Sequence, residues 1–252
     1  MEEQKETTPT GNKTFIAPSR KLEFSAPFRW LQLGWQDYKT ALRLSIEYGL
    51  FFAVGGLLLT LLLVMNSNEM TILSMAVLFI LLGPLFAFGL YDISRQLQKG
   101  ESPTLVHSIN QIRNSAANQW VFAVVVIVIG LIWMRAATMI HIFYPDDAEP
   151  TLEELLSFLA IGSVTGAFFA SLVFGISAFS LPMMVDRNVD AITASLTSLK
   201  AVMDNKWVAT LWAFLILVLV AVGFATFYLG LVVVLPVIGY ATWHGYRDTI
   251  LR

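Results

Sequence analysis

The sequence predicts an all-α polytopic membrane protein. Of its 252 residues, 56% are apolar and only 13% are charged, and the mean hydropathy is +0.68. A soluble domain carries about twice this share of charged residues, so the composition excludes an ordinary water-soluble enzyme. It also excludes a disordered chain, which would be poor in apolar residues. Apolar runs long enough to cross a bilayer and a one-sided distribution of basic residues both favour several membrane-spanning helices.

The N-terminal segment 1–28 is polar, and its Glu, Lys, Thr, Ser, Gly and Pro residues follow no apolar period. We expect a disordered cytoplasmic tail here. The apolar core of a signal peptide is not found near Met1, so we expect no cleavage. Residues 29–252 are then expected to form one transmembrane domain.

Six spans are predicted, because a spanning helix needs about 20 apolar residues. Runs of this kind lie near 44–65, 70–91, 120–140 and 155–184. The last run, Trp207–Ala241, carries no charge. As one helix it would extend for about 50 Å, against a hydrocarbon core of ~30 Å. A turn between Gly223 and Gly230 divides it into spans near 207–222 and 228–246, which gives three hairpins.

The basic residues test this count independently. With six spans, nearly all of them fall on one side of the membrane: Lys5, Lys13, Arg20, Lys21, Arg29, Lys39, Arg43, Arg95, Lys99, Arg113, Arg187, Lys200, Lys206, Arg247 and Arg252. The opposite loops hold Glu69, Asp146, Asp147, Glu149, Glu153 and Glu154. The positive-inside rule therefore places both termini in the cytoplasm, and in a bacterium the membrane would be the inner one. Trp120, Trp207 and Trp243, at predicted cytoplasmic ends, are typical of an interfacial aromatic belt.

A short amphipathic segment precedes each odd-numbered span. Apolar residues recur at spacings of 4, 3 and 4 in Leu31, Trp35, Tyr38 and Leu42, in Leu105, Ile109, Ile112 and Ala116, and in Ile192, Leu196, Leu199 and Met203. This period predicts helices with one apolar face, lying in the cytoplasmic interface. Pro84, Pro182 and Pro236 lie near the inner end of each hairpin. The pattern indicates a threefold pseudo-repeat, or alternatively only what any interfacial helix shows.

Polar groups gather at the predicted cytoplasmic end of each even-numbered span. We take as the candidate cluster Tyr91, Asp92, Arg95, Asp186, Arg187, Asp190, His244, Tyr246, Arg247 and Asp248. If the three exits converge, this cluster would bind an anion, a lipid headgroup or a protein loop. The alternative is that these groups pair at the water interface and hold the helices together, each exposed pair contributing about 0–1 kcal/mol.

The sequence gives no cofactor, metal or catalytic assignment. It has no cysteine, and its histidines, His107, His141 and His244, fall on different sides of the membrane without ligand spacing. Nucleophile-elbow, Walker and dinucleotide-binding patterns are missing. A net charge of −2 gives no reason to expect nucleic acid as a partner. Gly162, Gly166 and Ala170 form a small-residue stripe of the kind that packs helices closely, within the chain or between copies.

Several motifs together resemble a known family. They are Gly83-Pro84, the segments 89–95, 180–187 and 239–248, and the early Trp30, Gly34, Trp35 and Asp37. The chain is similar to bacterial integral membrane proteins catalogued as a domain of unknown function. Some members are labelled putative cytochrome c oxidase subunit I, a label that the scattered histidines do not support. The resemblance implies no activity and transfers no catalytic residue.

Three functions are compatible with these observations. The first is a non-enzymatic accessory or scaffold component of a membrane complex, embedded in the lipid bilayer with a membrane-protein partner or as a homo-oligomer. The second is a transporter or channel for ions or small solutes, built from Pro-interrupted hairpins. The third is a lipid-handling enzyme with Asp92, Asp190 and His244 as acid and base groups.

Overall fold

The computed structural model describes residues 16–65, 87–114, 116–141, 151–187 and 189–251. Every regular element in this part of the chain is a helix, apart from one isolated bridge between Ser19 and Ile250. The all-α prediction is confirmed. The helices are α1 (Ala26–Thr40), α2 (Leu42–Met65), α4 (Leu105–Asn114), α5 (Ala116–His141), α6 (Leu152–Ser177), α7 (Ser180–Asp186), α8 (Ala191–Asp204), α9 (Lys206–Ala225) and α10 (Leu231–Thr249). Residues 87–98 are also helical.

Four helical stretches are long and apolar enough to cross a membrane. They are Leu42–Leu62, Ala116–Ile140, Leu152–Asp186 and Lys206–Ala225. These stretches correspond to the predicted spans 44–65, 120–140, 155–184 and 207–222. Most of the predicted span 70–91 lies outside the described residues. The predicted span 228–246 is part of α10, which is not among the four because its second half is polar. The count of six therefore stays a prediction.

The last apolar run is broken where a turn was predicted. Helix α9 ends at Ala225 and α10 begins at Leu231, so Trp207–Ala241 is not one helix. Phe227 and Tyr228 adopt positive φ values of 53° and 69°. Residues with a side chain rarely adopt this backbone conformation, which is typical of tight turns. The Thr226 hydroxyl closes the turn by accepting a hydrogen bond from the Gly230 amide at 2.8 Å.

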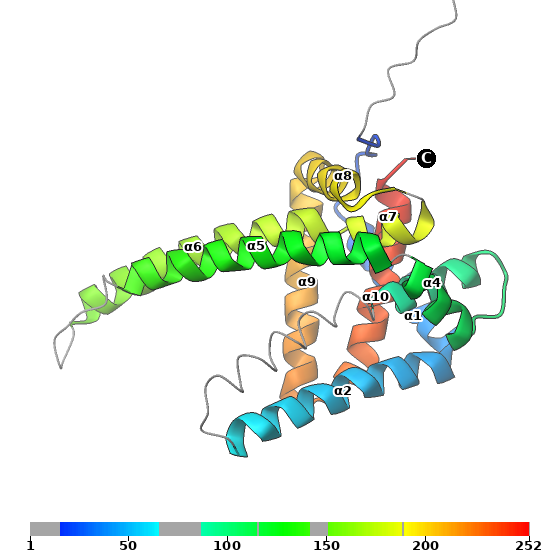
Figure 1. Ribbon diagram of the computed structural model, residues 1–252, viewed down its shortest axis with the longest axis horizontal. Coiled ribbons are helices and arrows are strands. Elements are labelled where there is room, and N and C mark those ends of the chain that lie inside the picture. The colour runs from blue at the N-terminus through cyan, green and yellow to red at the C-terminus, as the bar shows by residue number, and fades with distance from the viewer. Residues whose placement is uncertain (1–15, 66–86, 115, 142–150, 188, 252) are drawn as a thin grey trace, which may run out of the picture.

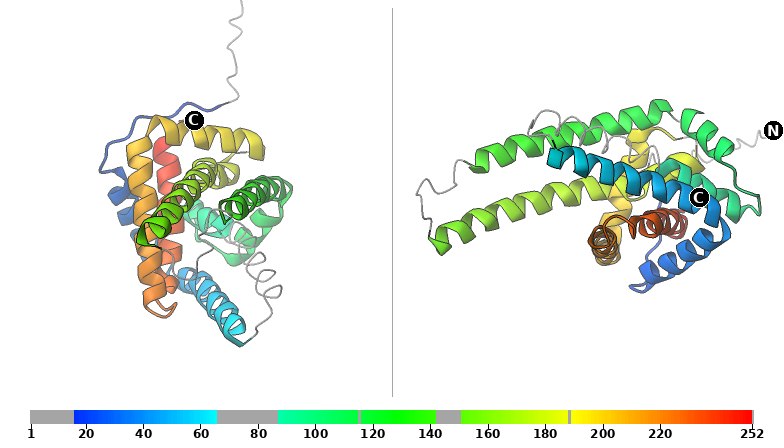
Figure 2. Two further views of the ribbon diagram at one scale, coloured as in Figure 1. Left: turned by 90° about the vertical axis from the view of Figure 1, so that its left-hand side faces the viewer. Right: turned by 90° about the horizontal axis from the view of Figure 1, so that it is seen from below.

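The long apolar helices do not share one direction. Helices α5 and α6 run side by side as an arm that extends away from the rest of the molecule (Figure 1). Helices α9 and α10 lie beside each other and run across the direction of this arm, as the view from below also shows (Figure 2). The structure is therefore not one parallel bundle, and the arrangement in three hairpins stays a prediction.

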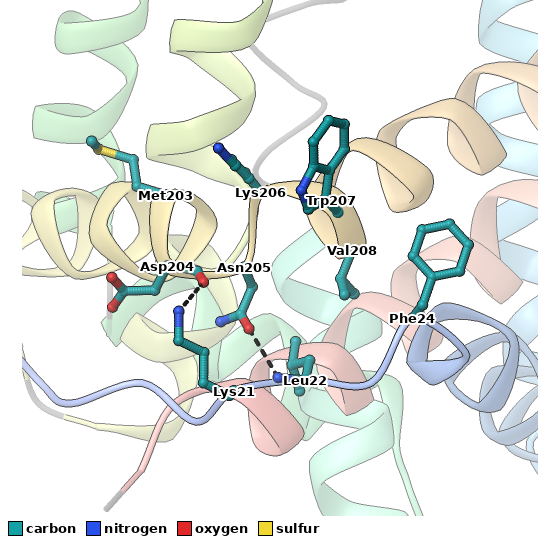
Figure 3. A pocket seen from close by; sticks show the side chains of 9 residues that line it. All are labelled: Lys21, Leu22, Phe24, Met203, Asp204, Asn205, Lys206, Trp207 and Val208. Atoms are coloured by element: carbon teal, nitrogen blue, oxygen red, sulfur yellow. Dashed lines mark hydrogen bonds between the residues drawn. The ribbon is translucent and has the colours of Figure 1, made fainter.

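The segment before α1 is ordered by contacts with the C-terminal half of the chain. The Arg20 amide donates to the Thr249 carbonyl at 2.8 Å, and the Leu22 amide donates to Asn205 Oδ1 at 2.9 Å (Figure 3). Residues 16–28 thus have defined contacts, and the domain division with a tail over 1–28 stays a prediction. Polar composition alone suggested disorder there, but backbone pairing with the chain end gives these residues fixed partners. Residues 1–15 lie outside the described part.

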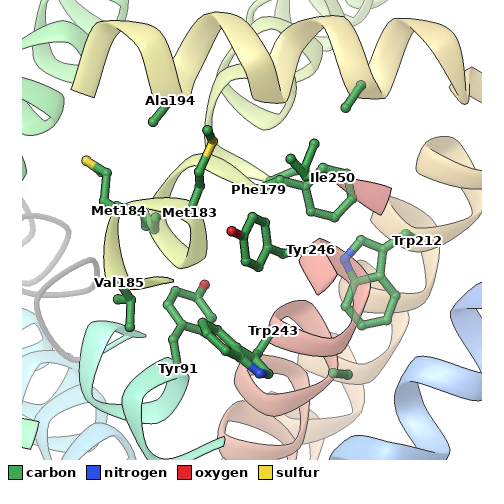
Figure 4. Close-up of a cluster of buried hydrophobic side chains, with 14 of the residues drawn as sticks. Tyr91, Phe179, Met183, Met184, Val185, Ala194, Trp212, Trp243, Tyr246 and Ile250 are labelled. Atoms are coloured by element: carbon green, nitrogen blue, oxygen red, sulfur yellow. The ribbon is translucent and has the colours of Figure 1, made fainter. Parts of the chain in front are cut away.

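Helix α10 is the centre of the fold and packs against α1, α2, α7 and α9. Its backbone comes very close to two glycines: a β-carbon on Gly34 would lie 2.7 Å from the Val237 carbonyl oxygen, and one on Gly49 would lie 2.1 Å from that of Val232. Such backbone-to-backbone contact is typical of small residues in membrane helices. The adjoining core is aromatic, with Trp212, Trp243 and Tyr246 buried around the end of α10 (Figure 4).

The three segments predicted as amphipathic helices are helices, α1, α4 and α8. The apolar stripe of α1 is divided, with Tyr38 buried and Trp35 44% exposed, and the stripe of α8 faces mostly outward. In α8 the small residues Ala194, Ser198 and Ala201 are buried, whereas Ile192 and Met203 are exposed. The expected interfacial position agrees with this arrangement, since an outward apolar stripe would contact lipid. The threefold repeat stays a prediction, because Pro84 lies outside the described residues.

Candidate functional site

The candidate cluster comes from three segments that meet at one end of the molecule, which we call the polar end: residues 87–98, α7 with Arg187, and the last turns of α10. Hydrogen bonds join the segments. Arg95 of the first segment donates to the Val185 carbonyl of α7 at 2.7 Å, and Arg247 of α10 donates to Asp186 at 2.9 Å. Tyr91 joins the same apolar cluster as Tyr246 (Figure 4). The three predicted exits therefore converge.

Asp92 is the most buried acid of the cluster, with no exposed surface. Its carboxylate accepts hydrogen bonds from Arg95 and Gln96, both at 2.8 Å, and from Ser108 at 3.2 Å. It also lies 2.7 Å from Nδ1 of His107. A buried carboxylate is tolerated only when partners of this kind surround it. The sequence pointed to Asp92 and Arg95, but not to His107 and Ser108, which reach the carboxylate from a separate helix.

A second acid, Asp37 of α1, was missing from the candidates. Its Oδ2 lies 2.8 Å from Nε2 of His244 and also accepts a hydrogen bond from the Ser94 hydroxyl. Nδ1 of the same imidazole lies 3.2 Å from Gln98 Nε2. An amide nitrogen can only donate, so Nε2 is the ring nitrogen that carries the proton toward Asp37. The only sequence signal for Asp37 was its place in the family-like motif near Trp35.

Asp186 fastens α7 to α10. Its carboxylate accepts hydrogen bonds from the Tyr246 hydroxyl at 2.8 Å and from Arg247 at 2.9 Å. Arg187 donates to the Tyr246 oxygen at 3.0 Å and to the Leu251 carbonyl at 2.8 Å. These four candidate side chains thus form one network.

Asp248 and Asp190 have other partners. Asp248 accepts from Arg29 at 2.5 Å and from the Trp30 indole at 3.0 Å, so it joins α10 to α1. Asp190 caps the start of α8, where its carboxylate accepts the amides of Thr193 at 2.9 Å and Ile192 at 3.0 Å. These amide bonds lower the pKa of Asp190. Asp190 is thus an exposed helix cap that shares no described hydrogen-bond partner with Asp92, Asp186 or Asp248, and the acid–base set of Asp92, Asp190 and His244 stays a prediction.

The polar end consists mainly of paired groups. Its buried carboxylates lie beside arginine, histidine, tyrosine or amide donors. These interactions hold the helices together. His107 differs from these buried groups. Its side chain is 47% exposed, although one of its ring nitrogens contacts the buried Asp92 carboxylate. Within the described ranges there is no group of three or more acidic, histidine or cysteine residues that would hold a metal ion.

A hollow lies apart from the polar end. It has a volume of about 640 Å³ and lies between residues 21–24 and the corner where α8 meets α9 (Figure 3). None of its lining residues belongs to the candidate cluster. They are Lys21, Leu22, Phe24, Met203, Asp204, Asn205, Lys206, Trp207 and Val208.

Comparison with protein families gives one match, over the middle of the chain. Residues 72–186 match the DUF2189 family. This family is described as a predicted integral membrane protein, which confirms the resemblance found in the sequence motifs. The DUF2189 match includes Asp92, the helices α4 to α6, and Asp186 at its end, and it stops before α8. No curated protein and no solved structure matches the chain.

Proposed function

We propose that this membrane protein is a non-enzymatic accessory or scaffold component of a bacterial inner-membrane complex. The observation that carries the proposal is the exposure of the arm of α5 and α6 within the described part of the chain. Only 6% of the membrane-length window in α5, and 11% of that in α6 and α7, is buried by the described residues. Beyond each other and α8, these two long apolar helices have few contacts among the described residues, which leaves a surface for another transmembrane segment.

The small residues of α6 support a protein partner. A β-carbon placed on Gly162 or Gly166 would meet no described atom within 4 Å. The stripe therefore makes none of the close contacts within the described chain that such stripes usually serve. Leu159 lies on the same helix face as Gly162 and Gly166, and 51% of its surface is exposed. A helix from a partner would find here small residues that allow close approach and an apolar side chain beside them.

The polar end supports a structural role rather than chemistry. Asp92, Asp186 and Asp248 each join separate helices through charged hydrogen bonds, which favours a rigid support for the arm. The predicted topology places this end and both termini in the cytoplasm. Such a support would keep the arm in a fixed position relative to whatever it contacts.

A transporter is the second candidate, and one observation favours it. The stretch Leu152–Asp186 is interrupted between α6 and α7, at Ala178 and Phe179. Ser198 satisfies the interrupted backbone, since its hydroxyl contacts the Phe179 amide at 3.0 Å and the Gly175 carbonyl at 2.8 Å. Interrupted helices form the solute sites of many transporters. Solute flux into vesicles that contain only this protein would favour this alternative.

Site-specific photo-crosslinking tests the scaffold proposal. A photoreactive amino acid replaces Leu159, on the stripe face of the arm, in the full chain at native expression level. The matched control replaces Phe122, which lies on α5 but is 2% exposed. We expect the first position to yield a stoichiometric adduct with a different membrane protein and the second to yield none.

A stripe variant makes the test specific. Gly166→Ile would block close approach of a partner helix and should abolish the Leu159 adduct. Val164→Ile, at a 72% exposed position of the same helix, should leave the adduct unchanged. Adducts with lipid alone, or with a second copy alone, would contradict the proposal.

A further inference from the structure

The hollow between residues 21–24 and the α8–α9 corner is positively charged on balance. Lys21 and Lys206 line it, together with a single acid, Asp204. The Asp204 carboxylate already accepts the Ser19 hydroxyl at 2.7 Å and the Lys200 ammonium at 3.1 Å. These contacts lower the pKa of Asp204, the hydroxyl bond having the larger effect. Lys200 and Lys21 both act on this single acid, so with Lys206 three lysines face one carboxylate and positive charge is in excess.

Both lysines keep donors available. Lys21 donates one hydrogen bond, to the Asp204 carbonyl at 2.6 Å, which leaves two N–H groups. The Lys206 ammonium lies over the Trp207 ring, with Nζ 5.6 Å from the ring centroid, and it donates no hydrogen bond to the described residues. An ammonium with free donors prefers an anionic oxygen ligand, and phosphate oxygens satisfy several donors at once.

The rim of the hollow is apolar and outward-facing. Trp207 is 71% exposed, Met203 68% and Phe24 62% (Figure 3). A hollow for a soluble anion would have no need of these side chains. A lipid would use both parts, because its headgroup bears the charge and its acyl chains need apolar surface.

The position of the hollow relative to the membrane agrees with a lipid. Lys206 and Trp207 are the first two residues of the apolar span Lys206–Ala225. Lysine and tryptophan at the end of a span are typical of the headgroup level. The positive-inside pattern assigns this end to the cytoplasmic leaflet, whose anionic lipids attract basic clusters.

We propose that this hollow binds the headgroup of an anionic phospholipid from the cytoplasmic leaflet. Lys21 and Lys206 bind its phosphate, and its acyl chains lie along Trp207 and the outer surface of α9. Asn205 connects the two walls of the hollow, since it accepts the Leu22 amide and donates to the Arg20 carbonyl, both at 2.9 Å. A bound lipid would therefore hold the N-terminal segment against the start of α9. This inference does not depend on a membrane-protein partner.

Native mass spectrometry of the full chain tests the site. The protein is released from nanodiscs that contain equal amounts of phosphatidylglycerol and phosphatidylcholine, and the retained lipid is counted. We expect one phosphatidylglycerol per chain to be retained in preference to phosphatidylcholine. Lys21→Ala with Lys206→Ala should weaken retention about tenfold or more, because each lysine near a membrane surface contributes about 1 kcal/mol to anionic lipid binding.

Matched variants separate the site from general charge. Lys39→Ala with Lys99→Ala removes the same charge from exposed positions elsewhere and should leave retention intact. Lys206→Arg keeps the positive charge and should also retain the lipid. This control distinguishes loss of the site from misfolding of the variant. Equal retention of both lipids, unchanged retention in the Lys21/Lys206 variant, or displacement of the lipid by millimolar inorganic phosphate would each overturn the proposal.

Discussion

At the scale of single residues, Asp92 has the highest expected cost of substitution. Asp92→Ala would leave the guanidinium of Arg95, which is 16% exposed, without its carboxylate partner. Removing one partner of a buried ion pair costs about 3–5 kcal/mol. We therefore expect low abundance and a strongly reduced unfolding temperature in mild detergent. Glu47→Ala is the control, since its pair with Arg43 is largely exposed and contributes about 0–1 kcal/mol. Equal effects of the two substitutions would contradict a structural role for Asp92.

Asp190 gives a prediction about pH. Hydrogen bonds from the amides of Thr193 and Ile192 lower its pKa below the unfolded value of about 3.9. Its stabilising effect is therefore present above that value and is lost as the pH falls through the lower, folded pKa. Asp190→Ala should cost about 1 kcal/mol at pH 7, as the loss of a helix cap does, and progressively less in acid. Asp190→Asn keeps a capping group and should stay close to the native unfolding temperature at pH 7. Thermal unfolding at pH 7 and pH 3 measures both, and a constant deficit of Asp190→Ala would contradict the cap.

At the scale of elements, close backbone contact at Gly49 sets the distance between helices α2 and α10. Gly49→Ala would place a β-carbon 2.1 Å from the Val232 carbonyl oxygen, so the two helices would have to separate. Overpacking of this kind costs about 1–3 kcal/mol. We expect a lower fraction of folded protein by size-exclusion chromatography in detergent. Gly130→Ala, where the added carbon meets nothing within 4 Å, should leave that fraction unchanged or raise it. The contact would be refuted if both variants behaved alike.

Elements also show what the sequence could and could not predict. Helix positions and the turn before Leu231 follow from apolar runs and charges, which are local properties of the chain. The pairing of Asp37 with His244 joins residues 207 positions apart and depends on how α1 packs on α10. The sequence predicted that α8 has one apolar face, but it did not show which residues pack against the protein. In the structure the small residues Ala194, Ser198 and Ala201 are buried and the larger Ile192 and Met203 are exposed.

At the scale of the whole molecule, the chain topology depends on whether α10 crosses the membrane. The helix has an apolar first half and a polar second half, so its length alone does not decide. The distribution of basic residues favours a crossing, because with α9 in the membrane Lys206 and Arg247 share a side only if α10 also spans. We therefore predict that the turn between them lies outside and that the C-terminus lies inside.

Cysteine labelling tests this arrangement directly, because the chain has no native cysteine. Leu229→Cys lies in the turn at a 74% exposed position, and Leu251→Cys lies near the C-terminus at a 36% exposed position. With a membrane-impermeant maleimide on spheroplasts, we expect labelling of the first and protection of the second. Lysis should then expose the second cysteine to the reagent, which shows that burial is not the cause of its protection. Labelling of Leu251→Cys before lysis would mean that α10 returns without crossing, and the polar end would then lie outside the cytoplasm.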